Sequence, residues 1–254
     1  MIDINKALIE FKKYVNNYDI NNDRIKLKLV HTYEVMKLSN YICQHENMSE
    51  TQTALASLIG LLHDIGRFEQ LKMFNSFLDS NIDHAKLGVK ILFEDNLIRK
   101  FIEDNKYDEI IKLSILNHSL YQPEVYNNEL LNTQIKIIRD ADKLDNFRVK
   151  NIEEIPTLFD VSKENFLNQV VSKNIMDDFR NHQLILKANR HNEMDMWISY
   201  SAFIFDLNFK SSYLYLQETN YFSRNIKRFK YCKENAQNML EIEKIGNDYI
   251  NKRC

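Results

Sequence analysis

A histidine and an aspartate stand side by side at the end of one of the most apolar runs of the chain, in the stretch SLIGLLHDIGRFEQ at residues 57–70. A carboxylate in such a place, here Asp64, raises the free energy of the fold unless a positive charge compensates it. The first question that the sequence poses is therefore which cation neutralises Asp64.

Four of the seven histidines lie on apolar stripes rather than on polar faces. His31, for example, follows Leu27 by four residues and precedes Val35 by four. Residues at such spacings share one face of an α-helix, so these side chains should point into the core. The four histidines are His31, His63, His84 and His118.

Asp142 follows the same pattern, because Ile138 precedes it by four residues and Ile135 by seven. A single inward histidine is usually a core residue bonded to the backbone, and a single buried aspartate usually pairs with Arg or Lys. Six inward ligand-type residues from five expected helices favour a shared site instead. The six are His31, His63, Asp64, His84, His118 and Asp142.

Histidine and carboxylate are ligands of borderline divalent cations, and the core of a helical bundle is a place where facing helices can assemble them. Such cations would compensate the charges of Asp64 and Asp142 in the interior. Six ligands are more than one tetrahedral ion needs, so we expect two divalent ions that share Asp64 as a bridge. Iron or manganese is the expected metal, with zinc, cobalt, nickel or magnesium as alternatives.

The elements that must position these residues are helices. The chain has only four glycines and two prolines, too few for the turns of a strand-rich protein, and its apolar residues recur at helical spacing. One helix should run from about 50 to 65, with a capping box at Ser49 and Gln52 and a left-handed C-terminal cap at Gly66. Further helices are expected at about 3–17, 83–95, 107–120 and 132–149, with several more after 160.

Pro156 in NIEEIPTLFD marks the expected break between two parts of the chain. We predict a metal-binding core over residues 1–150 and a C-terminal helical region, rich in Phe and Tyr, over residues 151–254. That second region is expected to pack on the core or to cap it.

Composition narrows the classes of partner. The chain has 254 residues, enough for a sizeable core, and its 34 Lys and Arg nearly balance its 36 Asp and Glu, so no basic field indicates nucleic acid or an acidic membrane. The longest apolar stretch, residues 196–205, is too short to span a bilayer, and MIDINKALIEFKK does not resemble a signal peptide. The cysteines, Cys43, Cys232 and Cys254, are odd in number and far apart, so we expect a soluble cytoplasmic protein without disulfides.

The order of these residues resembles a known pattern. His31, the pair His63 and Asp64, and then Asp142 stand as in the H…HD…D signature of the HD-domain metal-dependent phosphohydrolases. LLHDIGRF, DHAKLGVKIL and RDADKLD look like segments of that superfamily, and the resemblance covers roughly residues 25–148. It implies an all-α HD-domain helical bundle core and a small phosphorylated molecule as substrate.

His84 and His118 match the positions that hold a second metal ion in the dinuclear branch of this superfamily. The resemblance implies one ion at His31, His63, Asp64 and Asp142, and another at Asp64, His84 and His118. The chain departs from the cyclic-di-GMP phosphodiesterase branch, because Ser119 follows His118 and no Gly-Tyr-Pro occurs. It is closer in appearance to small bacterial HD hydrolases, including those that split diadenosine tetraphosphate.

The implied reaction is hydrolysis of a phosphoester by a hydroxide that bridges two metal ions, with Asp64 fixing their separation. Arg67 and Lys143 are placed to meet phosphate, although each is also typical of an ion pair at a helix end. Asp145 could orient a ligand, or could form an ordinary salt bridge.

Three functions remain open from the sequence. The first is a phosphohydrolase that acts on a nucleotide, a dinucleotide or another phosphoester. The second is an HD-fold mixed-valent di-iron oxygenase, which the same ligand set would also serve. The third is a non-catalytic module that binds a nucleotide.

Overall fold

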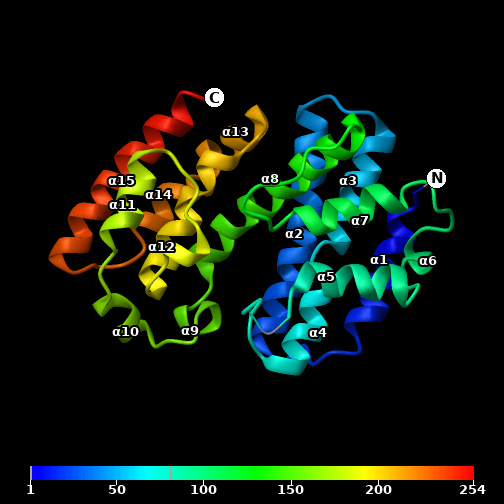
Figure 1. Ribbon diagram of the computed structural model, residues 1–254, viewed down its shortest axis with the longest axis horizontal. Helices are drawn as coiled ribbons and strands as arrows, with labels where there is room; N and C mark the ends of the chain where they lie inside the picture. Colours follow the sequence, from blue (N-terminus) through cyan, green and yellow to red (C-terminus); the bar gives the residue numbers. More distant parts are fainter. Residues whose placement is uncertain (1, 81) are drawn as a thin grey trace. The chain divides into compact units, whose positions relative to one another are not determined.

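A computed structural model describes residues 2–80 and 82–254 of the chain. Within these residues the protein is built of helices and contains no strand, so the prediction of an all-α fold is confirmed. The chain forms two compact units, one up to Asp142 and one from Lys143 onward. The boundary between them lies inside the long helix α8, Glu129–Ile152 (Figure 1).

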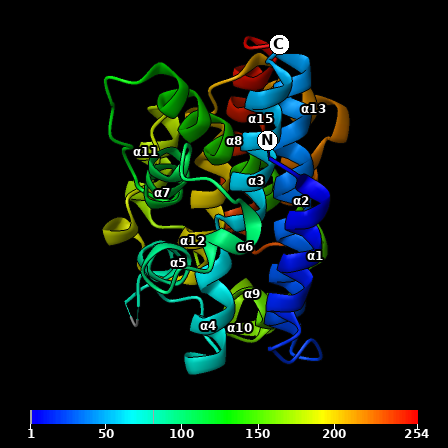
Figure 2. The ribbon, with the colours of Figure 1, turned by 90° about the vertical axis from the view of Figure 1, so that its right-hand side faces the viewer.

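The first unit is a bundle in which the long helices α2 and α3 pack side by side (Figures 1 and 2). Helix α1 packs on α3 and α6, α4 packs on α5, and α7 packs on both α3 and α5. The elements before α8 are α1 (Ile4–Val15), α2 (Asp23–His45), α3 (Glu50–Leu62), α4 (Ile65–Phe74), α5 (His84–Val89), a π-helix (Lys90–Glu94), α6 (Ile98–Phe101) and α7 (Asp108–Asn117).

The second unit is organised around the C-terminal helix α15, which packs on α11, α13 and α14. Its core is aromatic, and the buried Trp197 ring lies 5.7 Å from the Phe166 ring and 5.4 Å from the Phe229 ring. The elements are α9 (Ile155–Leu158), α10 (Lys163–Asn168), α11 (Lys173–Arg180), a 3₁₀ helix (Lys187–Asn189), α12 (Glu193–Ser201), a 3₁₀ helix (Ala202–Asp206), α13 (Lys210–Thr219), α14 (Tyr221–Ile226) and α15 (Lys233–Asn251).

Pro156 lies in the first turn of α9, where its missing N–H has no helical partner to lose. The preceding helix α8 has already ended at Ile152. None of the helices in the described residues combines the length and the apolar character that crossing a membrane requires. Cys43, Cys232 and Cys254 are free thiols.

The helix expected at about 50–65 is interrupted. Its start is confirmed, since Ser49 and Gln52 form both hydrogen bonds of the capping box. It ends at Leu62, however, and a separate helix begins at Ile65, so the expectation of a single helix to residue 65 is wrong.

The prediction that Gly66 forms a left-handed cap is also wrong, because Gly66 lies inside α4 and no described glycine has a positive φ. Its lack of a side chain serves helix packing instead. A Cβ at Gly66 would lie 2.3 Å from the His84 carbonyl oxygen and 2.6 Å from the Gly88 nitrogen. Gly66 therefore lets α4 approach the backbone of α5, which brings Asp64 near His84.

Replacing Gly66 by Ala should destabilise the protein. The new methyl group meets backbone atoms, which cannot rotate away, so the overpacking cost should lie toward the upper end of about 1–3 kcal/mol. It should exceed the gain of about 1 kcal/mol in helix propensity. Urea denaturation of metal-free protein measures the change.

Gly88→Ala is the matched control for Gly66→Ala. A Cβ at Gly88 would have no neighbour closer than 3.4 Å, so this substitution should be neutral or stabilising. Equal unfolding free energies for the two variants would contradict the packing role of Gly66.

Candidate metal centre

The six predicted ligand residues lie in the first unit and come from different elements. His31 lies within α2 and Asp142 within α8, whereas the other four lie at helix ends. His63 and Asp64 form the break between α3 and α4, His84 is the first residue of α5, and His118 directly follows α7. All four histidines and Asp64 are at most 4% exposed, and the Asp142 side chain is 20% exposed.

Asp64 occupies the N-cap position of α4, but its side chain makes no capping hydrogen bond. An N-cap aspartate ordinarily accepts a bond from a backbone N–H of the first turn. Here the carboxylate faces imidazole rings instead, and its two oxygens face different rings. The local break in the helix therefore directs Asp64 to the interior of the centre.

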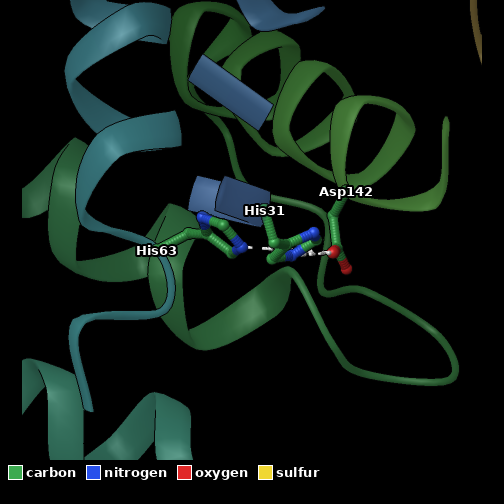
Figure 3. Close-up of side chains that lie close together, drawn as sticks. All are labelled: His31, His63 and Asp142. Carbon is green, nitrogen blue, oxygen red and sulfur yellow. Dashed lines mark ion pairs between the residues drawn. The ribbon is translucent and has the colours of Figure 1, made fainter. Parts of the chain in front are cut away.

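The first group of donor atoms gathers around Oδ2 of Asp64. His31 Nε2 lies 3.6 Å and His63 Nε2 lies 3.5 Å from this oxygen. Oδ1 of Asp142 lies 3.1 Å from His31 Nε2 and 4.0 Å from His63 Nε2. Figure 3 shows the side chains of His31, His63 and Asp142 converging from α2, from the end of α3 and from α8.

The second group gathers around Oδ1 of Asp64. His84 Nε2 lies 3.4 Å and His118 Nε2 lies 3.8 Å from this oxygen. The two Nε2 atoms lie 3.2 Å from each other. His63, Asp64 and His118 also offer donor atoms that all lie within 4.8 Å of one another, so the two groups adjoin.

The outer ring nitrogens of three histidines are fixed by hydrogen bonds. His63 Nδ1 donates to the Gly60 carbonyl oxygen at 2.8 Å, and His118 Nδ1 donates to the Ile115 carbonyl oxygen at 2.6 Å. His84 Nδ1 donates to Oδ1 of Asp79 at 2.7 Å. With the proton on Nδ1, a neutral ring presents the lone pair of Nε2 toward Asp64, which is the orientation that metal ligands need.

Burial keeps these rings neutral. It lowers the pKa of His84 to about 4, with the charge of Arg67 adding to the effect, and it lowers the pKa of His118 to about 4, with His63 adding to it. Burial also lowers the pKa of His63. At neutral pH all three are therefore imidazoles with an available lone pair.

The two carboxylates are ionised. Burial alone would raise the pKa of Asp64, but the positive charges of Lys28 and then of Arg67 hold it well below its usual range. Burial would likewise raise the pKa of Asp142, and the hydrogen bond and charge of His31 hold it below its usual range. The centre therefore combines neutral nitrogen donors with anionic oxygen donors.

This donor set fits divalent cations. Among the described residues, the buried His63 Nε2 and Asp64 Oδ1 have no hydrogen-bond partner. The Nε2 lone pairs of His84 and His118 face each other at 3.2 Å, an arrangement that repels unless a cation lies between them. Two donor atoms that bind the same cation at about 2.1 Å are roughly 3 to 3.5 Å apart. Most of the donor separations in this centre are close to that range.

Two side chains of the centre, Lys28 and Asp79, are not predicted by the sequence patterns. Lys28 lies one turn before His31 on α2, and its Nζ lies 2.5 Å from Oδ2 of Asp64. Asp79 lies five residues before His84 and accepts hydrogen bonds from both His84 and Arg67. The spacing of three residues between Lys28 and His31 was a usable signal, whereas no periodicity points to Asp79.

Arg67 lies at the second group. Its Nη1 lies 2.9 Å from Oδ1 of Asp79 and also donates to Gln70 and to the Phe77 carbonyl oxygen. Its Nε lies 3.7 Å from Oδ1 of Asp64. The guanidinium therefore ties together the two carboxylates on either side of His84.

The other predicted residues lie in the second unit. Lys143 is buried and forms an ion pair with Asp206 at 2.9 Å. Asp145 is buried and forms the salt bridge that was one of its two expected roles, with Arg148 at 2.5 Å. A phosphate-binding role for Lys143 stays a prediction.

Comparison with known families agrees with this geometry. Residues 29–146 match the model of the HD domain, and this segment contains all six residues of the centre. Searches of curated proteins and of solved structures returned no match. HD domains are typically metal-dependent hydrolases, and the histidine and aspartate groups described above could hold metal ions. The segment 29–146 is therefore an HD domain.

Proposed function

We propose that this protein is a phosphohydrolase that uses two divalent metal ions, iron or manganese, to hydrolyse a nucleotide, a dinucleotide or another phosphoester. The observation that carries the proposal is that the two carboxylate oxygens of Asp64 face different pairs of histidines. One of its oxygens faces His31 and His63, and the other faces His84 and His118. When bound, a pair of such ions supplies a nucleophile at neutral pH and stabilises charge on the phosphoryl oxygens.

In this proposal Asp64 would contribute to the ligands of both ions. His31, His63 and Asp142 complete the first group, and His84 and His118 complete the second. Because the pKa values of His63, His84 and His118 are lowered, these rings need not lose a proton to bind metal at neutral pH. Preformed lone pairs make the centre ready for a cation.

Asp79 and Arg67 position the second group. Asp79 holds the Nδ1 proton of His84 and so fixes the direction of its Nε2. Arg67 holds Asp79 in turn, and its Nε is buried next to Asp64 without a hydrogen-bond partner among the described residues. We propose Arg67 and Lys143 as the cations that meet substrate phosphate, and the cytoplasm, which keeps the three free thiols reduced, as the place of action.

Removing Asp64 should abolish metal loading. Asp64→Ala takes an oxygen from each group, so both ions and the activity should be lost, whereas His84→Ala or His118→Ala should lose one ion preferentially. Metal analysis of anaerobically purified protein gives the number of ions per chain. His45 is exposed, so His45→Ala is the control and should retain wild-type loading. Wild-type metal content in Asp64→Ala would refute the shared-carboxylate centre.

The activity is tested by an anaerobic screen with Mn(II). The panel includes nitrophenyl phosphate, nucleotides and diadenosine tetraphosphate, and the proposal expects release of phosphate or of a nucleotide product without oxygen. Consumption of O₂ that requires iron would instead establish an oxygenase. Nucleotide binding without turnover by metal-loaded protein would establish a binding module.

The affinity of the centre for metal ions should change little under mildly acidic conditions. Since the pKa values of His84 and His118 are lowered to about 4, protons compete for these ligands only well below neutrality. The affinity for Mn(II), measured by calorimetry, should stay nearly constant from about pH 8 to about pH 5 and fall at lower pH. An affinity that already falls steeply near pH 6.5, the ordinary range of histidine, would contradict the neutral, buried state of these rings.

A further inference from the structure

Lys28 forms an ion pair with Oδ2 of Asp64, the oxygen around which the first group of donor atoms gathers. Its Nζ lies 2.5 Å from Oδ2 of Asp64, the same oxygen that lies 3.6 Å from His31 Nε2 and 3.5 Å from His63 Nε2. The Lys28 side chain is only 13% exposed, so this ion pair lies in a medium where charges interact more strongly than in water. An ammonium ion therefore holds the place in which a metal ion would bind Asp64.

The charges of the centre indicate that Lys28 and metal ions compete for Asp64. Asp64, Asp79 and Asp142 bring three negative charges, and Lys28 and Arg67 bring two positive ones, so the metal-free centre is nearly balanced. Two divalent cations would leave a large excess of positive charge. That excess repels the nearest mobile cation and attracts an anion.

Lys28 is the cation that can move. Arg67 is held by Asp79, Gln70 and the Phe77 carbonyl oxygen, whereas Lys28 has a flexible four-carbon stem. Its Nζ lies 5.7 Å from the centre of the Phe77 ring, whose face can stabilise an ammonium group that leaves Asp64.

We propose that Lys28 exchanges partners when the centre fills: a metal ion takes Oδ2 of Asp64 from the ammonium group, and the released ammonium then binds a phosphoryl oxygen of the substrate. The second half rests on the proposed phosphohydrolase function. The first half depends only on the competition between Lys28 and metal for Asp64.

The exchange is tested by Mn(II) calorimetry on whole-chain variants. Lys28→Met should bind the tightest Mn(II) equivalent at least about tenfold more strongly than wild type, a factor that corresponds to roughly 1.4 kcal/mol. Lys28→Arg, which keeps the charge, should bind with an affinity near that of wild type. The melting temperature of the metal-free Lys28→Met protein should fall, and its rise on adding Mn(II) should exceed that of wild type.

Lys26→Met is the matched control, because Lys26 is exposed and lies two residues away on the same helix. It should leave Mn(II) affinity unchanged, which separates the local contact from the loss of one charge on the chain. If Lys28→Met folds poorly, Lys28→Gln keeps a hydrogen bond to Asp64 without the charge and should show the same direction of change. Wild-type affinity in both neutral variants would overturn the exchange.

The second half is tested by titrating inorganic phosphate into Mn(II)-loaded protein, below the concentration at which manganese phosphate precipitates. Lys28→Met should bind phosphate at least about tenfold more weakly than wild type. Unchanged phosphate affinity would overturn the contact with the substrate. Suppose that Lys28→Met binds Mn(II) more tightly but the wild-type protein hydrolyses no phosphoester. This result would refute the proposed function and leave the competition between Lys28 and metal for Asp64 established.

Discussion

The structure of the first unit depends on the burial of one carboxylate, that of Asp64, which is 2% exposed. A buried charge of this kind is tolerated only when nearby groups compensate it. In this protein the compensating charges are those of Lys28 and Arg67, which lie on opposite oxygens of Asp64. Four imidazole rings surround the same carboxylate. The elements of the bundle bring these groups together at a single point.

Two local features of the backbone make this convergence possible. The chain leaves the helical path at His63 and Asp64, which frees the Asp64 side chain from capping α4. Gly66 then lets the backbone of α5 come close, so that His84 reaches the same carboxylate. The centre is thus built by the packing of short helices against the long ones.

Helical periodicity was enough to predict the fold class and the inward direction of the four histidines, because His31 and its apolar neighbours repeat at 3.6 residues per turn. The order of these residues was also enough to predict the HD domain that residues 29–146 match. The cap predicted at Gly66 was wrong, because a glycine after an apolar helix is typical of a cap. The backbone atoms that Gly66 faces belong to a segment about twenty residues away, which a local pattern does not include. Lys28 and Asp79 were missed because their roles arise from contacts across the bundle or across a loop, which a local pattern does not contain.

The two groups of donors differ in how the backbone supports them. His31 and Asp142 lie inside the long helices α2 and α8, whereas His84 begins a short helix and His118 follows the end of another. Helix ends open locally at a lower free energy than helix interiors. A cation held by His84 and His118 would therefore dissociate faster than one held by His31 and Asp142, so that chelators would strip the two positions at different rates.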